Sequence, residues 1–393
     1  MPLPDFAAAL SAMPTSSAAD ILPVLGHAAS PLGTDIHLYL LDFEGLVLQP
    51  VLVGPELDDV SVPDLPVSGT PAGEAFRTGR PIAEPGTGGV RVWAPIVERS
   101  EPTGVVAITV PQADPTTLDA CAALGLFAGL LIQSTSRSSD VLHLSRRRRP
   151  MTLGASMQWD MLPPLLIDSP GGMACGALEP AYEIAGDVFD YAINGNELHA
   201  VLFDGMGHGV ESTLMTVLAT GAYRHARRQG EGPAEMYGAV DEALRRHYGG
   251  EGFATGAVVR LQLDSGTLDW VNGGHPRPLL LRNRRVVRQL ECSPSLPFGL
   301  GGGCREEATE QLEPGDSILF FTDGVTEGRP VGGDEFGLDR LVEVVESDPE
   351  MSDPEPGGEL LHRLRKAVVE YQSGKLRDDA TLLLLHWEGP GAS

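Results

Sequence analysis

Short apolar stretches alternate with turn-forming residues from about residue 171 to residue 387. Apolar runs bounded by glycine, proline and asparagine predict strands. We expect these strands at residues 198–203, 257–263, 268–271, 278–282, 317–321 and 380–386. Longer segments predict helices at residues 209–228, 234–248, 338–346 and 358–371. Many strands with a few long helices predict packed sheets flanked by helices.

The first part of the chain has a different order of elements. A helix at residues 18–29 precedes strands at 36–42 and 45–51, and a short helix at 72–78 precedes strands at 89–95 and 104–110. A strongly apolar helix at 118–134 closes the region. Residues 15–137 are therefore expected to form an α+β domain of the sensory type, and the fold class of the whole chain is α+β.

A connector separates the two regions. Arg146 to Arg149 form a run of four like charges, which is typical of a solvated linker, and Pro150 follows them. Leu153, Met157 and Met161 then recur at helical spacing before two prolines, so one face of this helix is expected to pack. We expect a helical linker at residues 138–165, which either transmits a signal or only joins the domains, and a second domain at 166–388.

The composition of the chain argues against some classes of binding partner and indicates the cellular compartment. The chain has 393 residues, with 54 acidic and 28 basic side chains and a formal net charge of −26. Such a charge opposes binding to nucleic acid and to anionic membranes. The four cysteines are scattered, which argues against a thiolate zinc site or a disulfide framework. The N-terminus lacks a basic signal-peptide start, and we read no apolar run of about 18 residues, so a cytoplasmic protein without a membrane span is expected.

Acidic residues stand at the ends of several apolar strands in the second region. They are Asp187, Asp204, Asp323, Asp378 and Asp379. Gathering such carboxylates at one sheet edge is unfavourable unless divalent cations lie between them. Oxygen ligands favour Mg²⁺ or Mn²⁺ over Zn²⁺, and the glycine at 205 lets its own carbonyl approach a cation. The alternative is that each aspartate begins an ordinary turn.

Residues 67–81, 92–96 and 104–108 carry a pattern of strands and turns that resembles a GAF domain. The resemblance covers about 120 residues of the N-terminal region. It implies either a domain that binds a small molecule of unknown identity, with a possible homodimer, or a structural dimerisation domain without a ligand.

An ordered set of motifs covers the second region. The motifs are Gln158 to Pro163, Glu179 to Tyr191, Phe203 to Gly209, Asn272 to Pro276, Pro297 to Leu300, Phe320 to Glu327 and Arg377 to Thr381. Residues 151–388 resemble a PPM-type, metal-dependent serine/threonine protein phosphatase of the SpoIIE-like branch. The resemblance implies a β-sandwich flanked by helices, with two Mn²⁺ or Mg²⁺ ions in a cleft at one end.

The resemblance also assigns roles to residues. Asp187 and Asp204 would flank the ions with the carbonyl of Gly205, and Asp323 and Asp378 would bind from the other side. Asp379 is a further metal residue in this assignment, and both Asp379 and Asp190 are also candidates for a supporting position behind the ligands. Two departures are Ala185, where a second glycine is usual, and the lack of an arginine beside Asp187 to bind phosphate.

The implied reaction is hydrolysis of phosphoserine or phosphothreonine without a covalent intermediate. Two cations about 3.5–4 Å apart would activate a bridging water. The implied substrate is a phosphorylated protein, of the anti-sigma-factor antagonist type, under the control of the GAF-like domain. The alternatives are a ligand-sensing scaffold with weak or no phosphatase activity and a hydrolase of small phosphate esters. For His208 and His275 we favour structural hydrogen bonding over a general-acid role.

Overall fold

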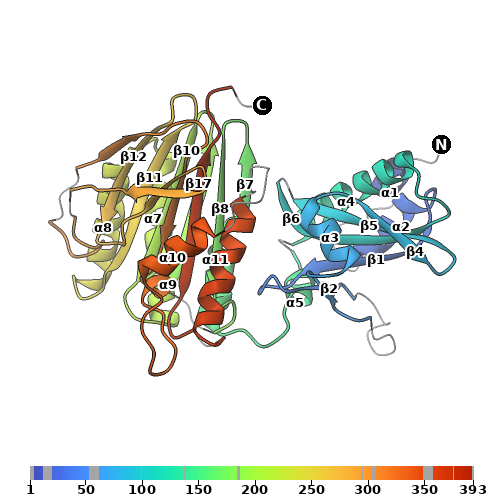
Figure 1. The fold of residues 1–393 in the computed structure, drawn as a ribbon, viewed down its shortest axis with the longest axis horizontal. Helices are drawn as coiled ribbons and strands as arrows, with labels where there is room; N and C mark the ends of the chain where they lie inside the picture. Colours follow the sequence, from blue (N-terminus) through green and yellow to red (C-terminus); the bar gives the residue numbers. More distant parts are fainter. Residues whose placement is uncertain are drawn as a thin grey trace. The chain divides into compact units, whose positions relative to one another are not determined.

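The computed structural model describes residues 4–11, 20–52, 62–98, 100–136, 138–183, 186–293, 295–302, 306–347, 357–374 and 376–391. The chain divides into two compact units, Met1–Pro150 and Met151–Ser393 (Figure 1). The boundary falls inside the expected linker of residues 138–165. Helix α6 (Leu153–Met161), which the sequence assigned to that linker, therefore lies in the second unit.

In the described part of the first unit, six antiparallel strands form one sheet in the order β3-β2-β1-β6-β5-β4. The strands are β1 (Thr34–Leu41), β2 (Val47–Pro50), β3 (Leu65–Pro66), β4 (Ile82–Gly86), β5 (Gly89–Glu98) and β6 (Glu101–Val110). One face packs on α1 (Phe6–Ser11), α2 (Ile21–Ala29) and α4 (Pro115–Thr135), and the other packs on α3 (Pro71–Thr78). Val106 and Ile108 join the first core, whereas Val105 and Ala107 join the second. Because β6 is buried on both faces, its sequence is continuously apolar rather than alternating.

Helix α4 is the exception to the expectation that no segment is long enough to span a membrane. Among the described residues it is the one helix that is long and apolar enough by length and composition. Its most apolar stretch is 44% buried inside the structure, where Leu124 and Leu131 belong to the core of the first unit. A core helix passes the same test of length and composition, so this feature alone does not indicate a membrane protein.

The arginine run is not a freely solvated linker. Arg146 donates from Nε to the carbonyl of Leu41 at 2.9 Å, and the short helix α5 (Val141–Ser145) precedes it. Arg148 and Arg149 both pair with Glu44, at 3.3 and 2.9 Å. The run therefore packs on the acidic turn between β1 and β2, where opposite charges favour this contact.

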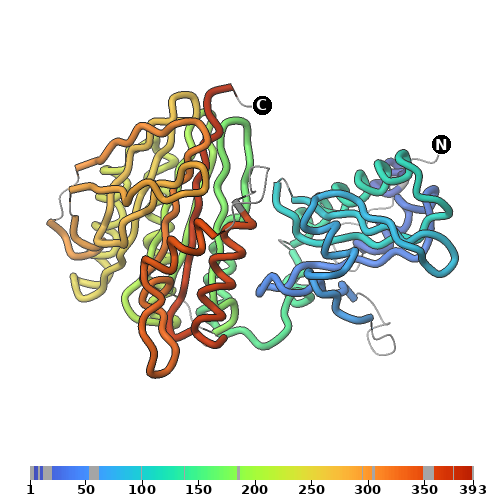
Figure 2. Tube along the Cα trace, in the orientation of Figure 1, coloured from blue at the N-terminus to red at the C-terminus, as the bar shows by residue number. Residues whose placement is uncertain are grey.

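The described residues of the second unit form two antiparallel sheets that pack face to face. One has the order β15-β12-β11-β10-β9 and the other has the order β14-β13-β16-β17-β8-β7. The strands are β7 (Leu166–Ser169), β8 (Gly172–Glu179), β9 (Asp187–Asn194), β10 (Glu197–Gly205), β11 (Ala254–Gln262), β12 (Thr267–Gly273), β13 (Leu279–Arg282), β14 (Arg285–Gln289), β15 (Ala308–Gln311), β16 (Ser317–Phe321) and β17 (Ala380–Trp387). Figure 2 shows how the last strand of the chain, β17, lies beside β8.

Helices cover the outer face of each sheet, as Figure 1 shows. Helices α7 (Val210–Arg228) and α8 (Pro233–Tyr248) pack on the first sheet. Helices α10 (Gly337–Glu346) and α11 (Gly357–Tyr371) pack on the second, and the short α9 (Asp323–Thr326) follows β16. In β17, Leu383 and Leu385 face the other sheet, whereas Leu382 and Leu384 face the helices. The expected sandwich flanked by helices is confirmed.

Candidate functional site

The alternation of side chains along the strands places three aspartates at one end of the sandwich interior. Phe189 faces the interior from β9, and Leu202 does so from β10. Asp187 and Asp204 continue these two inward rows, because residues two apart on a strand share a face. They are also direct partners in the register of β9 with β10. Asp379 continues the inward row of β17 from the opposite sheet.

Asp187 and Asp204 are close neighbours across the two strands. Asp187 directs its backbone N–H to Oδ2 of Asp379 at 3.0 Å, and its carbonyl accepts from Nε2 of Gln158 at 2.6 Å. The N–H and C=O groups of Asp187 therefore both point away from β10. This is the pattern of an antiparallel residue pair that exchanges no backbone hydrogen bonds. In such a pair the Cβ atoms lie about 4.5–5.5 Å apart.

The second sheet contributes the remaining carboxylates. Asp378 accepts from the N–H of Asp379 at 3.0 Å, just before β17. Asp323 begins α9 directly after β16. A Cβ at Gly324 would lie 1.9 Å from the carbonyl oxygen of Asp379, so only glycine lets these two segments approach so closely.

Thr322 joins the two sheets at this point. Its hydroxyl donates to Oδ2 of Asp187 at 2.8 Å and accepts from the N–H of Thr381 at 3.0 Å. Thr322 is fully buried, and its hydroxyl both donates and accepts a hydrogen bond inside the protein. This hydrogen bond fixes one oxygen of Asp187.

Burial and mutual repulsion raise the pKa values of the acids. For Asp187 burial is the largest cause, followed by the charges of Asp204 and Asp379. Burial and then the charges of Asp323, Asp378 and Asp379 raise the pKa of Asp204 to about 7. Burial raises the pKa of Asp379 to about 7, although the N–H of Asp187 opposes this. The pKa of Asp378 is also raised, mainly by burial. Each of the five carboxylates thus lies within electrostatic reach of at least one other, and we call them the acid cluster.

The acid cluster has the chemistry of a site for hard divalent cations. Its donors are all oxygens, and among the described residues Oδ1 of Asp379 is a buried acceptor without a hydrogen-bond partner. The geometry is not that of a finished site. Within the described ranges, no three His, Cys, Asp or Glu side chains are arranged to hold a metal ion. A bound cation would therefore have to draw the carboxylates together.

The carbonyl of Gly205 is already engaged. It accepts from the hydroxyl of Ser212 at 2.8 Å, and a Cβ on Gly205 would lie 2.5 Å from that hydroxyl oxygen. A carbonyl has two lone pairs, so this contact leaves one for a further donor or a cation. The glycine here allows α7 to begin close to the end of β10.

Asp190 lies apart from the acid cluster. It is three residues from Asp187 on β9, so it faces α7 instead of the interior. It pairs there with Arg224 at 2.7 Å and with Arg227 at 2.8 Å. Two arginine side chains therefore neutralise Asp190 on the face of β9 that is turned away from the acid cluster.

The two histidines differ in environment. His275 is buried, shares a hydrogen bond of 3.0 Å with the hydroxyl of Thr255, and has a pKa lowered by burial to about 3. It is therefore neutral at physiological pH. His208 is exposed in the turn between β10 and α7, and its charge acts on Asp378.

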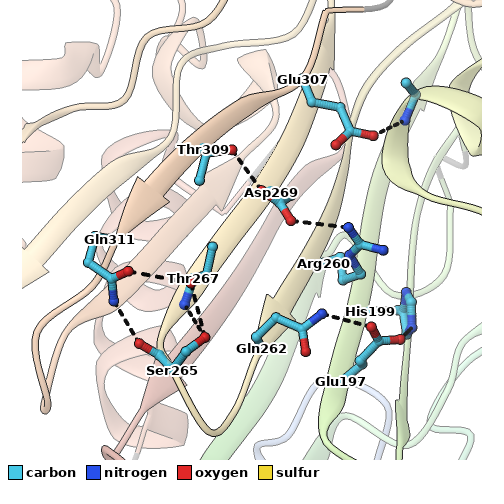
Figure 3. Close-up of polar contacts among 11 residues, drawn as sticks. Glu197, His199, Arg260, Gln262, Ser265, Thr267, Asp269, Glu307, Thr309 and Gln311 are labelled. Carbon is cyan, nitrogen blue, oxygen red and sulfur yellow. Dashed lines mark hydrogen bonds and ion pairs between the residues drawn. The ribbon is translucent and has the colours of Figure 1, made fainter.

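At the opposite end of the first sheet of this unit, polar side chains form a separate set of contacts, shown in Figure 3. Glu197 accepts from Gln262 at 2.7 Å and pairs with His199 at 3.1 Å. Asp269 pairs with Arg260 at 3.1 Å. These acids have polar or cationic partners, whereas no Lys or Arg in the described part of the chain forms an ion pair with the acid cluster.

Sequence reasoning missed the hydrogen-bonding residues around the acids, above all Gln158. We expected α6 to pack through Leu153, Met157 and Met161. The structure buries Gly154, Ala155 and Gln158 most deeply. Met161 packs against the core under α7 and Met157 is half-buried, but Leu153 is 64% exposed. The apolar spacing did not reveal Gln158, because part of the buried face of α6 meets a polar site.

Residues 194–388 match the sequence model of the family "Stage II sporulation protein E (SpoIIE)". The second unit carries a SpoIIE-family domain. The chain is 26% identical over 154 residues to phosphoserine phosphatase RsbP of Bacillus subtilis, which is 36% of this chain and 37% of that protein. It is 23% identical over 212 residues to phosphoserine phosphatase RsbU of the same organism, covering 52% of this chain and 60% of that protein.

A solved structure agrees with the fold of the SpoIIE-family domain. The SiaA-PP2C domain of Pseudomonas aeruginosa superimposes with a TM-score of 0.50 at 21% identity, covering 59% of this chain and 94% of that chain. At this identity the similarity shows a PP2C-like fold. The chain spans 37% to 60% of the lengths of the two phosphatases it resembles.

Proposed function

We propose that this chain is a metal-dependent phosphatase that hydrolyses phosphoserine or phosphothreonine in a protein substrate. The observation that carries the proposal is the acid cluster, in which carboxylates from both sheets come together without a lysine or arginine partner among the described residues. The SpoIIE-family match and the printed names of the relatives, both phosphoserine phosphatases, support this assignment.

The metal residues we propose are Asp187, Asp204, Asp323, Asp378 and Asp379, together with the carbonyl of Gly205. Two Mn²⁺ or Mg²⁺ ions bound there would supply Lewis-acid activation of a water nucleophile and would neutralise the phosphoryl oxygens. A phosphate dianion would otherwise be repelled by the ionised acids, so cation binding and substrate binding are coupled.

The chain's own residues orient the acids. Thr322 donates to Oδ2 of Asp187 and so fixes the position of that carboxylate. Asp379 holds the backbone of Asp187 at the start of β9. Gly324 permits the close approach of Asp323 to this point. Such preorganisation reduces the rearrangement needed when charge develops on the phosphoryl group.

Further parts of the proposal concern the partners. The substrate class we propose is a phosphorylated protein of the anti-sigma-factor antagonist type, in a cytoplasmic signalling pathway. Residues 15–137 are proposed to be a GAF-like regulatory domain that binds an unidentified small molecule or forms a homodimer. The mixed architecture of the first unit, with helices on both faces of an antiparallel sheet, supports this part.

The test is Mn²⁺-dependent release of phosphate from a phosphoserine protein by the full chain. Asp204→Asn and Asp323→Asn should abolish turnover while the circular dichroism spectrum is preserved. Asp264→Asn is the matched control, because Asp264 is an exposed aspartate in a turn of the same unit. Full activity in either cluster variant refutes the assignment.

Two comparisons separate the alternatives. Absence of turnover in the wild type with saturating Mn²⁺ would favour a ligand-sensing scaffold. Turnover of small phosphate esters at a higher kcat/KM than phosphoprotein would favour a small-molecule hydrolase.

A further inference from the structure

Helix α6, the first element after the boundary between the units, approaches the acid cluster closely. Thr152 caps the helix by accepting from the N–H of Ala155 at 3.2 Å, and its hydroxyl donates to the carbonyl of Glu183 at 3.1 Å. The buried face of α6 combines the small residues Gly154 and Ala155 with the longer Gln158. The two small residues let the helix backbone come close, and Gln158 is the long side chain of that face.

The side-chain amide of Gln158 contacts two members of the acid cluster. Gln158 is 2% exposed. Its Nε2 donates to the carbonyl of Asp187 at 2.6 Å and lies 3.5 Å from Oδ2 of Asp379, the oxygen that accepts from the N–H of Asp187. One amide nitrogen therefore contacts the backbone of one acid and the carboxylate of another.

The position of β9 explains why Asp187 needs these contacts. Strand β9 lies at the edge of its sheet, so its outward backbone groups have no neighbouring strand. Buried N–H and C=O groups must find partners, and those of Asp187 find Asp379 and Gln158. Removal of the Gln158 amide would leave the carbonyl of Asp187 without this partner and would free the start of β9 to move.

The chemical type of the side chain also matters. An amide donates hydrogen bonds without adding charge. A lysine or arginine at this place would neutralise the acids and compete with a cation, and a glutamate would add to their repulsion. A neutral donor is the side chain that can orient these acids and leave their charge for a cation.

We propose that Gln158 is a positioning residue of this site: through one amide it holds the backbone of Asp187 and the carboxylate of Asp379 beside each other, at the place where cations would bind. This inference rests on the proposed function, since it assigns those acids to cation binding. Residues behind metal ligands typically change metal affinity or activity by about 10-fold to 100-fold when they are replaced.

The test compares two variants of Gln158 with a control on the same helix, all in the full chain. Gln158→Met keeps the length of the side chain and removes the donor, and Gln158→Asn keeps the amide but shortens its reach. Trp159→Phe is the control, because it removes a hydrogen bond of 2.9 Å from α6 to the carbonyl of Ala181 without touching the acids. Mn²⁺ affinity is measured by calorimetry, kcat and KM with a phosphoserine protein, and stability by thermal unfolding.

We expect both Gln158 variants to weaken Mn²⁺ binding by at least about tenfold, whereas Trp159→Phe changes it less than twofold at a comparable loss of stability. If Gln158→Met does not fold, Gln158→Asn decides the question alone. Wild-type Mn²⁺ affinity in a folded Gln158 variant, or an equal loss in Trp159→Phe, overturns the inference. A wild-type chain that binds no Mn²⁺ overturns the proposed function, and the inference with it.

Discussion

Replacement of Asp204 by asparagine is predicted to stabilise the cation-free protein at neutral pH. Between about pH 4 and pH 7, folded Asp204 retains a proton that the unfolded chain has released, because its pKa is raised from 3.8 to about 7. The unfolding free energy of the wild type therefore falls as the pH rises through this range. Asparagine lacks this contribution because its amide does not ionise.

The magnitude follows from the size of the pKa shift. One pKa unit corresponds to about 1.4 kcal/mol, so ionised Asp204 costs the cation-free folded state about 4 kcal/mol. Burial of the neutral asparagine amide still costs about 1–3 kcal/mol. The expected net gain for Asp204→Asn at pH 8 is about 2 kcal/mol, or about 4–8 °C in the Tm of a unit of this size.

The assay is thermal unfolding of the full chain from pH 4 to pH 8, in EDTA and in saturating Mn²⁺. Tryptophan fluorescence reports mainly on the second unit, which contains Trp159, Trp270 and Trp387. In EDTA the advantage of Asp204→Asn should be largest near pH 8. Near pH 4 the variant should be the less stable protein, because wild-type Asp204 is then neutral when folded and only the cost of burying the asparagine amide remains. In Mn²⁺ the order should reverse, because binding to the folded state stabilises the wild type. A variant that is less stable than the wild type by the same margin at every pH, with no response of either protein to Mn²⁺, would refute this reasoning.

Three further substitutions test separate contacts. Thr322→Val removes the hydrogen bond to Asp187 and should cost about 1–3 kcal/mol in urea unfolding, with weaker Mn²⁺ binding; an unchanged midpoint would contradict the role of this contact. Asp190→Ala leaves two arginines unpaired and should cost about 3–5 kcal/mol, while calorimetry shows an unchanged Mn²⁺ affinity. Gly324→Ala forces its Cβ against the carbonyl of Asp379, so it should lower stability by about 1–3 kcal/mol and reduce turnover by at least about tenfold; wild-type turnover would show that the segment can shift without harm.

Much of the fold could be predicted because the central strands are buried on both faces. The stretches at 198–203, 257–263 and 380–386 read as continuous apolar runs, and they lie at β10, β11 and β17. The sequence placed Asp187 beside an apolar stretch but gave no bounds for β9, because Asp190 and Asn194 interrupt its apolar pattern. It missed β14 and β15, which lie at sheet edges and are largely solvent-exposed, so their residues are under weak hydrophobic constraint. It also missed β7 and β8, although β8 is mostly buried between its neighbours.

The sequence by itself determined that aspartates stand at the ends of apolar strands, and their residue types already indicated hard cations. Only the tertiary structure decided which of them meet. Asp187 and Asp190 belong to one motif, yet the period of two along a strand sends one into the sandwich and the other to the arginines of α7. Gln158 shows the same limit for a helix. Its side chain contacts Asp187 and Asp379, which lie 29 and 221 positions further along the chain. No local sequence pattern encodes contacts at such separations.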